Sequence, residues 1–339
     1  MRHFPPRAPG TREASTSETS HSVPVSSMNS RASLVSVDLR IGTSRSSITS
    51  RTVAKSLPNA LDWETMLRYL APRCTPGVEN VSVEASTYSR TLRIGRARGW
   101  IAVCAPPEAR ALTVTLSKSL VRHAETVLRR VACLVDAEAD LPRINRALSA
   151  DPVLAPLVRR HPLLRVAGAV DRFELALRAV LGQQVSVAAA STFSGRLAAL
   201  LGEPIADAPD VPAGLSRLGV TAERLAESRP SWIAKVGLTR ARAATAVALA
   251  QAVMGGVLDG DSDPEATIAA LREIRGIGDW TASYIAMRAL HWSDAFPHGD
   301  LGLRKAAGGL TARQLLAVAE RWRPWRAYAA MHLWASLHA

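Results

Sequence analysis

The sequence predicts an α+β fold in which a small antiparallel-sheet N-terminal domain is followed by an all-α domain. Residues 78–117 contain short runs of alternating apolar and polar residues, separated by Gly, Pro and Arg, and this is the period of half-buried strands. From about residue 141 onward, apolar residues recur every three or four positions, as they do in amphipathic helices. The 339 residues, 47% of them hydrophobic, suffice for two or three domains with real cores.

The chain is expected to divide into three parts. Residues 1–56 are rich in Ser, Thr, Arg and Pro and poor in large hydrophobic residues, so they are predicted to form a disordered tail. Residues 57–140 would form the small α/β domain, and residues 141–339 would form the helical domain. The tail is either a functional segment or an overextended start of translation, and its sequence leaves both alternatives open.

Within the small domain, residues 61–73 show helical spacing with Asp62 as a plausible cap, and a second helix is expected at about 120–134. Strands are predicted at residues 78–86, 87–95, 99–106 and 111–117. Helices would cover one face of the resulting sheet. The small domain carries no obvious catalytic residue, so we interpret it as a scaffold.

The charge balance favours a polyanionic partner. Lys and Arg number 42 against 29 Asp and Glu, which gives a net charge of +13, and nucleic acid is the leading candidate. A solvated basic surface would give the same count. Lys235, Arg240 and Arg242 could face DNA, and a solvated basic face would explain them equally well.

The cysteine and hydropathy patterns argue against several classes of protein. Cys74, Cys104 and Cys133 show no C-x-x-C spacing, so neither a disulfide framework nor a zinc site is indicated. No apolar run approaches the roughly 20 residues of a membrane span, and the N-terminus lacks the apolar segment of a signal peptide. We expect a cytoplasmic protein with no metal site built from side chains and no membrane partner.

In the helical part, two segments stand out. Residues 171–202 predict a helix whose apolar face contains Phe173, Leu177, Val180 and Leu181; a Gly-Gln-Gln break at 182–184 interrupts it, and a long Ala-rich helix follows. Further helices are expected between 211 and 256, and Pro264 would open the next one. The break is either a helix corner or a loop that presents polar amides at the surface.

A glycine hairpin follows at residues 275–278. Leu271 and Ile274 close one amphipathic helix, Gly276 and Gly278 can take backbone angles closed to other residues, and Asp279 is expected to cap a second helix. Backbone amides at this positive helix end can bind a phosphate without reading bases. The residues assigned to this DNA-backbone hairpin are Arg275, Gly276, Ile277, Gly278 and Thr281.

The second hairpin helix, which should end near His291, carries Trp280 and Tyr284 one turn apart, and Asp300 follows Trp280 by twenty residues. A glycine hairpin, Trp-Thr-Ala and an aspartate in DAFPHGDLGLRK resemble the helix–hairpin–helix DNA glycosylase superfamily. Within it, the chain resembles the AlkA type, DNA-3-methyladenine glycosylase II, from about Pro58 to the C-terminus.

This resemblance implies a monofunctional DNA glycosylase that hydrolyses the N-glycosidic bond of alkylated purines, of the 3-methyladenine and 7-methylguanine type, in double-stranded DNA by base flipping. Asp300 would be the catalytic carboxylate, and Trp280, Tyr284 and Trp334 would line the base pocket. The Gln183 and Gln184 loop would be the intercalation loop, with Gln184 at the wedge position. The small domain would precede the helix–hairpin–helix glycosylase domain, as in the family.

The resemblance also bears on cofactors. Bifunctional relatives resembling endonuclease III carry a lysine where Trp280 stands, and no lysine occurs here between Lys235 and Lys305, so water is the expected nucleophile. Those relatives bind an iron–sulfur cluster through C-terminal cysteines, and none follows Cys133. No cofactor is expected, except for a possible monovalent cation at the hairpin carbonyls. The expected protein is a monomer that binds double-stranded DNA containing alkylated bases.

Alternatives remain at this point. Asp300 could be an ordinary helix N-cap, and Trp280 and Trp334 could be core residues. The chain could be a non-catalytic helix–hairpin–helix DNA-binding module of a damage-response regulator, because such hairpins also occur without chemistry. It could also be a glycosylase for oxidised or mismatched purines.

Overall fold

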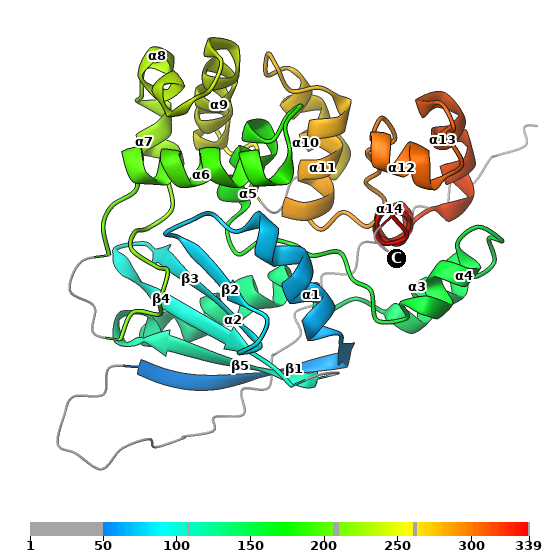
Figure 1. The fold of residues 1–339 in the computed structure, drawn as a ribbon, viewed down its shortest axis with the longest axis horizontal. Coiled ribbons are helices and arrows are strands. Elements are labelled where there is room, and N and C mark those ends of the chain that lie inside the picture. The colour runs from blue at the N-terminus through cyan, green and yellow to red at the C-terminus, as the bar shows by residue number, and fades with distance from the viewer. Residues whose placement is uncertain (1–49, 107–108, 206–209, 260–262, 338–339) are drawn as a thin grey trace, which may run out of the picture. The chain divides into compact units, whose positions relative to one another are not determined.

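The computed structural model describes residues 50–106, 109–205, 210–259 and 263–337, drawn in colour in Figure 1. The predicted disorder of residues 1–49 lies outside the described residues. For residues 50–56 the prediction is wrong, because they belong to a strand, β1 (Ser50–Leu61). Val53 and Leu57 of this strand are buried in the core of the sheet domain.

The sheet has five strands in the order β1-β5-β4-β3-β2, and every neighbouring pair is antiparallel. The four predicted strands are β2 (Glu79–Ser82), β3 (Thr87–Ile94), β4 (Ala97–Cys104) and β5 (Ala109–Ser117). In β5, Leu112, Val114 and Leu116 are fully buried while Thr113 is exposed, so the alternation in the sequence corresponds to an inner and an outer face. The antiparallel sheet is confirmed.

The missed strand β1 is an edge strand that resembles a loop in composition. Half of the residues in its segment SRTVAKSLPNAL are polar, the segment contains Pro58, and the register with β5 shifts between Ser56 and Leu61. Proline lacks the N–H group of a ladder bond and is therefore tolerated only at sheet edges and bulges. Pairing with β5 forms this strand, and local propensity does not reveal it.

Two helices pack against the sheet. In α1 (Trp63–Leu70), Asp62 caps the first turn as predicted, since its carboxylate accepts from the Thr65 N–H at 3.0 Å. The second, α2 (Ala124–Leu134), follows a 3₁₀ turn at Lys118–His123. Trp63 and Val131, one from each helix, are fully buried in the same core as the strands.

The first group of helices forms the largest hydrophobic core. The predicted apolar face of Phe173, Leu177, Val180 and Leu181 is buried in it. The helices are α5 (Arg172–Leu181), α6 (Val187–Leu201), α7 (Ala222–Ala226), α8 (Pro230–Ile233), α9 (Arg240–Met254), α10 (Pro264–Arg272) and α11 (Asp279–Ala289).

Of the helices expected between residues 211 and 256, the first is short and starts only at Ala222. This helix is α7, with Thr221 as its cap, and the residues before it are extended because Ser216 donates its backbone N–H to the carbonyl of Gly77 at 2.8 Å. A contact with the sheet domain therefore replaces the first helical turns.

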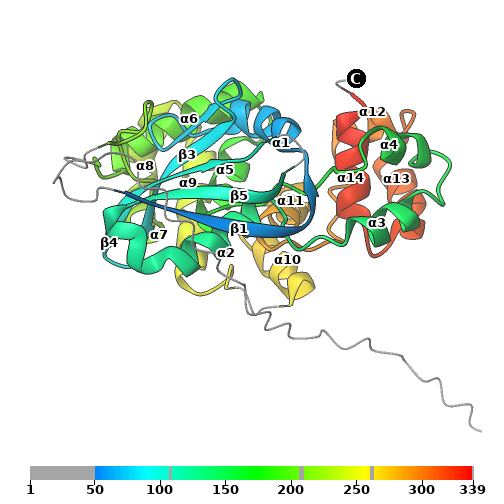
Figure 2. The same ribbon diagram turned by 90° about the horizontal axis from the view of Figure 1, so that it is seen from below.

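The second group of helices brings together two distant parts of the chain, which Figure 2 shows side by side. Ile144, Leu154, Leu303 and Met331 share one core, and Trp322 is buried there with its indole N–H on Asp151 at 2.9 Å. The members are α3 (Leu141–Leu148), α4 (Ala155–Arg160), α12 (Leu301–Ala306), α13 (Ala312–Ala319) and α14 (Arg326–Ala335).

Helix α11 belongs to both groups. Ala282 and Ile285 are buried in the first core, and Ala286 and Met287 are buried in the second. The helix therefore fixes the hairpin, which ends in its first turn, relative to the N-terminus of α12 and the end of α14. This arrangement positions the candidate site.

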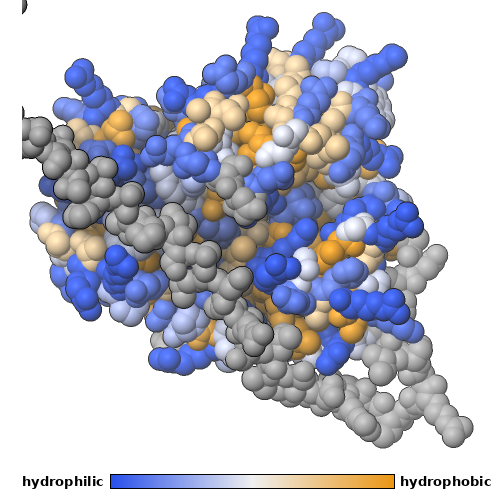
Figure 3. Space-filling model, turned by 180° about the vertical axis from the view of Figure 1, so that it is seen from behind, coloured by the Kyte–Doolittle hydropathy of each residue, from blue (hydrophilic) through white to orange (hydrophobic). Residues whose placement is uncertain are grey.

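On the face drawn in Figure 3, hydrophilic side chains surround smaller apolar patches. Among the exposed large hydrophobic residues, Leu301 is the most accessible at 76%. It lies at the first position of α12, directly after Asp300, so an apolar side chain projects into solvent beside the candidate carboxylate. Among the described residues, no helix is both long and apolar enough to cross a membrane.

Candidate active site and nucleic-acid interface

The hairpin between α10 and α11 needs a glycine at one of its two glycine positions. Gly276 has φ +95°, and a Cβ there would lie 2.2 Å from Thr245 Oγ1. Gly278 has φ −97°, which any residue can adopt, and a Cβ there would meet nothing within 4 Å. The expectation that both glycines take restricted angles is therefore wrong for Gly278, whose missing side chain instead leaves open space at the start of α11.

The cap of α11 also differs from the expectation. Gly278 is the N-cap and makes no side-chain cap bond, whereas Asp279 is the first helical residue and pairs with Arg272 at 2.8 Å. An acidic residue in the first turn complements the helix dipole without capping it. The first-turn N–H groups of α11 therefore have no side-chain partner, and they are available to an anion.

The five predicted hairpin residues fall into two sets. Arg275, Gly276 and Gly278 are exposed. The side chains of Ile277 and Thr281 are buried, with exposed fractions of 4% and 3%, so these two residues can reach a phosphate only through their backbone.

The two loop glutamines have different environments. Gln183 Nε2 donates to the Gly276 carbonyl at 2.8 Å and to Thr281 Oγ1 at 3.0 Å, which holds the loop against the hairpin. Gln184 is exposed at the tip of the loop with φ +55°, a left-handed angle that is uncommon for a residue other than glycine. Of the two glutamines, Gln184 is the more exposed.

A third residue, Arg242, fixes this loop. Its Nη2 donates to the Gln183 carbonyl at 2.6 Å, and its side chain is only partly exposed. Arg242 was expected on a DNA-facing or solvated surface together with Lys235 and Arg240, and those two are exposed. The sequence gives no sign of the contact with Gln183, because 59 positions separate the two residues.

Asp300 lies at the meeting point of three elements. It caps α12, with Oδ1 accepting from the Leu303 N–H at 2.9 Å. Oδ1 also accepts from Trp334 Nε1 at 2.9 Å, and Oδ2 accepts from Trp280 Nε1 at 2.9 Å. The residue is thus both a helix cap and the common acceptor of two indole N–H groups, which orient the carboxylate.

The predicted pocket aromatics gather around this carboxylate. The rings of Trp280 and Tyr284 stack with centroids 5.2 Å apart and planes 10° apart. The Trp334 ring meets Tyr284 edge-on at 6.4 Å. All three are partly exposed, in contrast to the buried Trp322, so they form an accessible aromatic wall beside Asp300.

Behind the wall, Tyr284 is held by residues that the sequence analysis missed. The buried Arg288 donates from Nη1 to Tyr284 Oη at 2.6 Å and to Tyr69 Oη at 3.0 Å, and it also donates to the carbonyls of Ala167 and Gly168. The contact between Tyr284 and Arg288 could have been predicted, because the two residues are four positions apart and lie on one helix face. The contact of Arg288 with Tyr69 could not, because 219 positions separate the two residues.

The guanidinium groups change the acidity of this phenol. Burial, the largest single influence, raises the pKa of Tyr284, but Arg288, Arg73, the hydrogen bond with Tyr69 and Arg178 together outweigh it, so the pKa lies below the ordinary tyrosine value. The guanidinium of Arg288 thus lies against the phenol end of Tyr284, away from the ring face that stacks on Trp280.

No side-chain metal site is evident in the described ranges, since no group of three or more His, Cys, Asp or Glu residues could hold an ion there. Two hairpin carbonyls already accept bonds, that of Arg275 from Thr245 Oγ1 at 2.9 Å and that of Gly276 from Gln183. A carbonyl has a second lone pair, so a monovalent cation remains compatible with the hairpin.

Comparison with known proteins gives a consistent result. The family model of the AlkA N-terminal domain matches residues 57–171, which extends past the predicted boundary at 140 to include α3 and α4. The DNA-3-methyladenine glycosylase 2 of Escherichia coli (strain K12) is 35% identical over 275 residues, covering 80% of this chain and 93% of the relative.

A second relative is longer than this chain. The probable bifunctional transcriptional activator/DNA repair enzyme AlkA of Mycobacterium tuberculosis (strain ATCC 25618 / H37Rv) is 41% identical over 280 residues, which cover 81% of this chain and 55% of the relative. The chain thus spans about half the length of that relative.

The fold has a match among solved structures. The 3-methyladenine DNA-glycosylase from Archaeoglobus fulgidus matches with a TM-score of 0.71 at 22% identity, covering 83% of this chain and 96% of that chain. At this identity the likeness concerns the fold, and it supports the predicted combination of a small antiparallel sheet with a helical part.

Proposed function

Because the chain belongs to the AlkA-type DNA-3-methyladenine glycosylase family, we propose that it is a monofunctional DNA glycosylase that removes alkylated purines from double-stranded DNA in base excision repair. The observation that carries the proposal is the position of Asp300, whose carboxylate is held by Trp280 and Trp334 beside an accessible aromatic wall. A protein that only binds DNA needs neither this carboxylate nor this wall.

The hairpin and the glutamine loop would hold the duplex. The first-turn amides of α11, next to the bare backbone of Gly278, would bind a phosphate without reading the sequence. Gln184 would occupy the gap that the extruded nucleotide leaves. Flipping costs a few kcal/mol and costs least for a weakly paired lesion, which contributes to selectivity.

The aromatic wall would select lesions by charge. Purines methylated at N3 or N7 carry a positive charge, and the faces of Trp280, Tyr284 and Trp334 attract a desolvated cation by up to about 2 kcal/mol each. Charge and bond lability, more than a hydrogen-bond code, would then define the substrates, so we expect a broad range of alkylated purines.

Asp300 would stabilise the transition state of hydrolysis. As the bond between C1′ and the base nitrogen breaks, its electron pair leaves with the base and positive charge develops on the sugar. An ionised carboxylate stabilises that charge, and water then adds to C1′ with loss of a proton. No redox group is needed, and we keep a monovalent cation at the hairpin carbonyls as part of the proposal.

DNA containing alkylated bases is accordingly the proposed partner, the proposed compartment is the cytoplasm, and the proposed active form is a monomer. One aspartate, one aromatic wall and one hairpin, all from the same chain, would supply the groups that this chemistry needs.

The proposal is tested by release of a labelled methylated base from duplex DNA under single-turnover conditions. We expect release of 3-methyladenine and 7-methylguanine without strand cleavage by the wild type, and at least a hundredfold slower release by Asp300→Asn. DNA binding without release would favour the non-catalytic binding module. Release of 8-oxoguanine or a mismatched purine instead would change the substrate assignment.

A further inference from the structure

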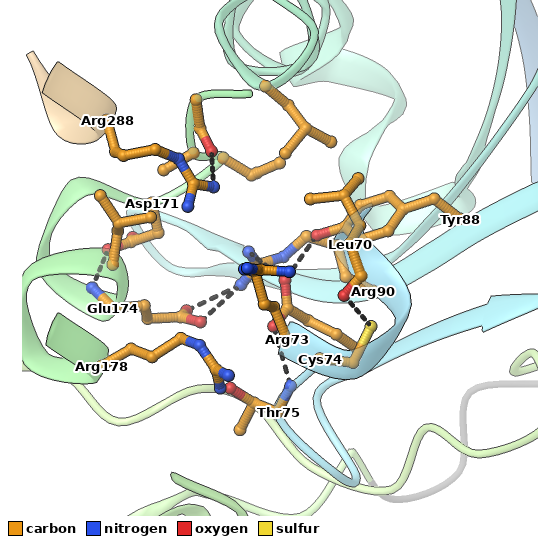
Figure 4. A pocket seen from close by; sticks show the side chains of 16 residues that line it. Leu70, Arg73, Cys74, Thr75, Tyr88, Arg90, Asp171, Glu174, Arg178 and Arg288 are labelled. Atoms are coloured by element: carbon orange, nitrogen blue, oxygen red, sulfur yellow. Dashed lines mark hydrogen bonds and ion pairs between the residues drawn. The ribbon is translucent and has the colours of Figure 1, made fainter. Parts of the chain in front are cut away.

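A cavity of about 50 Å³ lies between the sheet domain and α5 (Figure 4). Four arginines line it, one from the turn after α1, one from β3, one from α5 and one from α11: Arg73, Arg90, Arg178 and Arg288. Three carboxylates also line it, Glu79, Asp171 and Glu174. The arginines and carboxylates do not pair one to one. The net charge of the cavity therefore depends on which arginines have a carboxylate partner.

Arg90 takes up two of the three carboxylates. Its Nη2 donates to both oxygens of Glu174, at 2.8 and 2.9 Å, and its Nη1 lies 3.6 Å from Glu79. The third carboxylate, Asp171, caps α5 and lies 3.7 Å from Arg130, outside this set. The carboxylates are therefore already engaged.

The other three arginines have only neutral acceptors. Arg73 donates to the Tyr69 carbonyl at 2.8 Å, Arg178 donates to the Val187 carbonyl at 3.4 Å, and Arg288 donates to tyrosine hydroxyls and backbone carbonyls. Within the described part of the chain, none of the three lies within 4.0 Å of a carboxylate oxygen. Three like charges thus share one partly enclosed space, and the Arg90 cluster, with one positive and two negative side chains, offsets only one of them, so a further counter-charge would be favourable.

Arg178 provides the second, independent observation. Its Nη1 is buried, and in the described structure it has no hydrogen-bond partner. A buried donor on a charged group is almost always satisfied in proteins. In Figure 4 the side chains of Arg73, Arg178 and Arg288 extend toward the cavity from different elements, so the space that they share is where an acceptor would lie.

The size of the cavity fits a small ligand. A single water needs about 10–15 Å³ of such space. The observed volume of about 50 Å³ is several times larger, so it can hold a tetrahedral group with several acceptor oxygens. Arginine forks match phosphate oxygens in geometry as well as in charge.

We propose that this cavity is an oxyanion site of the phosphate class, in which Arg178 is the main donor and Arg73 and Arg288 supply the remaining positive charge. The site differs from the glycosidic-bond chemistry and from the hairpin, and Arg288 connects the two regions because it also holds the hydroxyl of Tyr284. A bound anion would neutralise charge at the back of the aromatic wall. The anion is either free inorganic phosphate or a phosphate of the DNA backbone.

The test compares the full chain with two variants in the absence of DNA. Arg178→Gln removes the proposed donor, and Arg313→Gln, at an exposed arginine of α13, removes an equal charge elsewhere. Thermal unfolding is followed in inorganic phosphate and in sodium chloride of the same ionic strength. For the wild type and Arg313→Gln we expect a saturable rise in Tm of about 3–5 °C at a phosphate concentration roughly 100-fold above the dissociation constant. Arg178→Gln should show no phosphate-specific rise.

Two results would overturn the proposal. One is equal unfolding of the wild type in phosphate and in chloride, which would leave only water in the cavity. The other is an unchanged phosphate response of Arg178→Gln, which would locate the anion elsewhere. Neither result depends on base release, so the proposed glycosylase activity is tested separately.

A second arm identifies the source of the anion once the phosphate response is found. Binding of undamaged duplex is measured in phosphate and in chloride at equal ionic strength. Weaker binding in phosphate for the wild type, but not for Arg178→Gln, assigns the site to a DNA phosphate. Equal binding in both salts assigns it to free phosphate.

Discussion

Trp280 and Asp300 are twenty positions apart, and the indole N–H of the first donates to the carboxylate of the second at 2.9 Å. The same tryptophan stacks on Tyr284. One side chain therefore contributes to both the candidate base wall and the candidate catalytic group. A change at Trp280 should consequently affect lesion choice and chemistry together.

Asp300→Asn should abolish most base release while leaving binding of damaged DNA largely intact. An asparagine can still cap α12 through its oxygen, but its NH₂ group faces one of the two indole donors and its charge is lost. Electrostatic stabilisation of this kind is worth about 3–4 kcal/mol, which corresponds to a rate loss of roughly a hundredfold or more. Single-turnover kinetics measure base release, and a binding titration measures the affinity for damaged DNA. A release rate near that of the wild type would mean that Asp300 acts only as a helix cap.

Trp280→Ala should slow the release of cationic 3-methyladenine and 7-methylguanine more than that of neutral hypoxanthine. The indole is partly exposed, so the melting temperature should change only modestly. A core tryptophan would behave differently, because its truncation costs about 3–5 kcal/mol of stability and lowers activity on every substrate alike. Release rates on a charged and a neutral lesion, measured with thermal unfolding, distinguish the two.

Trp322→Ala is the matched control for this variant. Trp322 is buried in the second helical core, with an exposed fraction of 2%, and its indole N–H donates to Asp151 instead of Asp300. It should lower the melting temperature strongly and should not change the ratio of rates on the two lesions. If Trp280→Ala behaves like Trp322→Ala, selection of cations by the aromatic wall is wrong.

Local sequence patterns predicted those features whose residues are neighbours within one helix or one strand. The four-residue spacing of Trp280 and Tyr284 and the alternation in β5 each depend on neighbours within one turn or one strand, and the position of Asp300 came from the family pattern. These features were predicted correctly in position, while their roles remain predictions. The predicted cap of α11 was wrong by one residue: Gly278 is the N-cap, and Asp279 is the first helical residue and pairs with Arg272.

Features that depend on distant partners could not be predicted. Strand β1 pairs with β5, whose partner residues lie much later in the chain, from Ser50 with Ser117 to Leu61 with Ala109. Arg288 has an obvious helical neighbour in Tyr284, but its burial depends on Tyr69 and on two carbonyls far along the chain. Pairings of this kind are set by tertiary packing, which no local pattern encodes.

Gln183→Ala and Gln184→Ala should have different effects although the residues are adjacent. Gln183→Ala leaves the Gly276 carbonyl and the buried Thr281 hydroxyl without their donor, so it should lower stability by about 1–3 kcal/mol and weaken DNA binding. Gln184→Ala removes only an exposed tip and should leave the melting temperature unchanged.

The wedge role is tested by opposite-base dependence. Gln184→Ala should slow release of a lesion in a stable pair more than release of the same lesion in a mismatch, because a mismatched base costs less to extrude. Equal slowing in both duplexes would argue against a wedge. A loss of thermal stability in Gln184→Ala as large as that of Gln183→Ala would contradict the different environments of the two residues.

The Asp136 carboxylate should make stability fall as pH rises through mild acid. It accepts from Tyr328 Oη at 2.8 Å and from the Val166 N–H at 3.2 Å, and burial raises its pKa to about 6 despite these bonds and the nearby Arg165. Between the unfolded pKa of 3.8 and the folded value of about 6, the folded chain holds a proton that the unfolded chain has lost, so stability decreases as pH rises across this window. The full effect is on the order of 3 kcal/mol.

Asp136→Asn cannot ionise, so the difference in unfolding free energy between the variant and the wild type should shift in favour of the variant from pH 4 to pH 7. The difference cancels the contributions of other titrating groups, such as Glu174, whose pKa burial raises to about 7, and His332, whose pKa burial lowers to about 4. Denaturant unfolding of both proteins at several pH values measures it. A difference that stays constant from pH 4 to pH 7 would mean that Asp136 is already ionised in the folded protein at pH 4, with its charge satisfied by Arg165 and Tyr328.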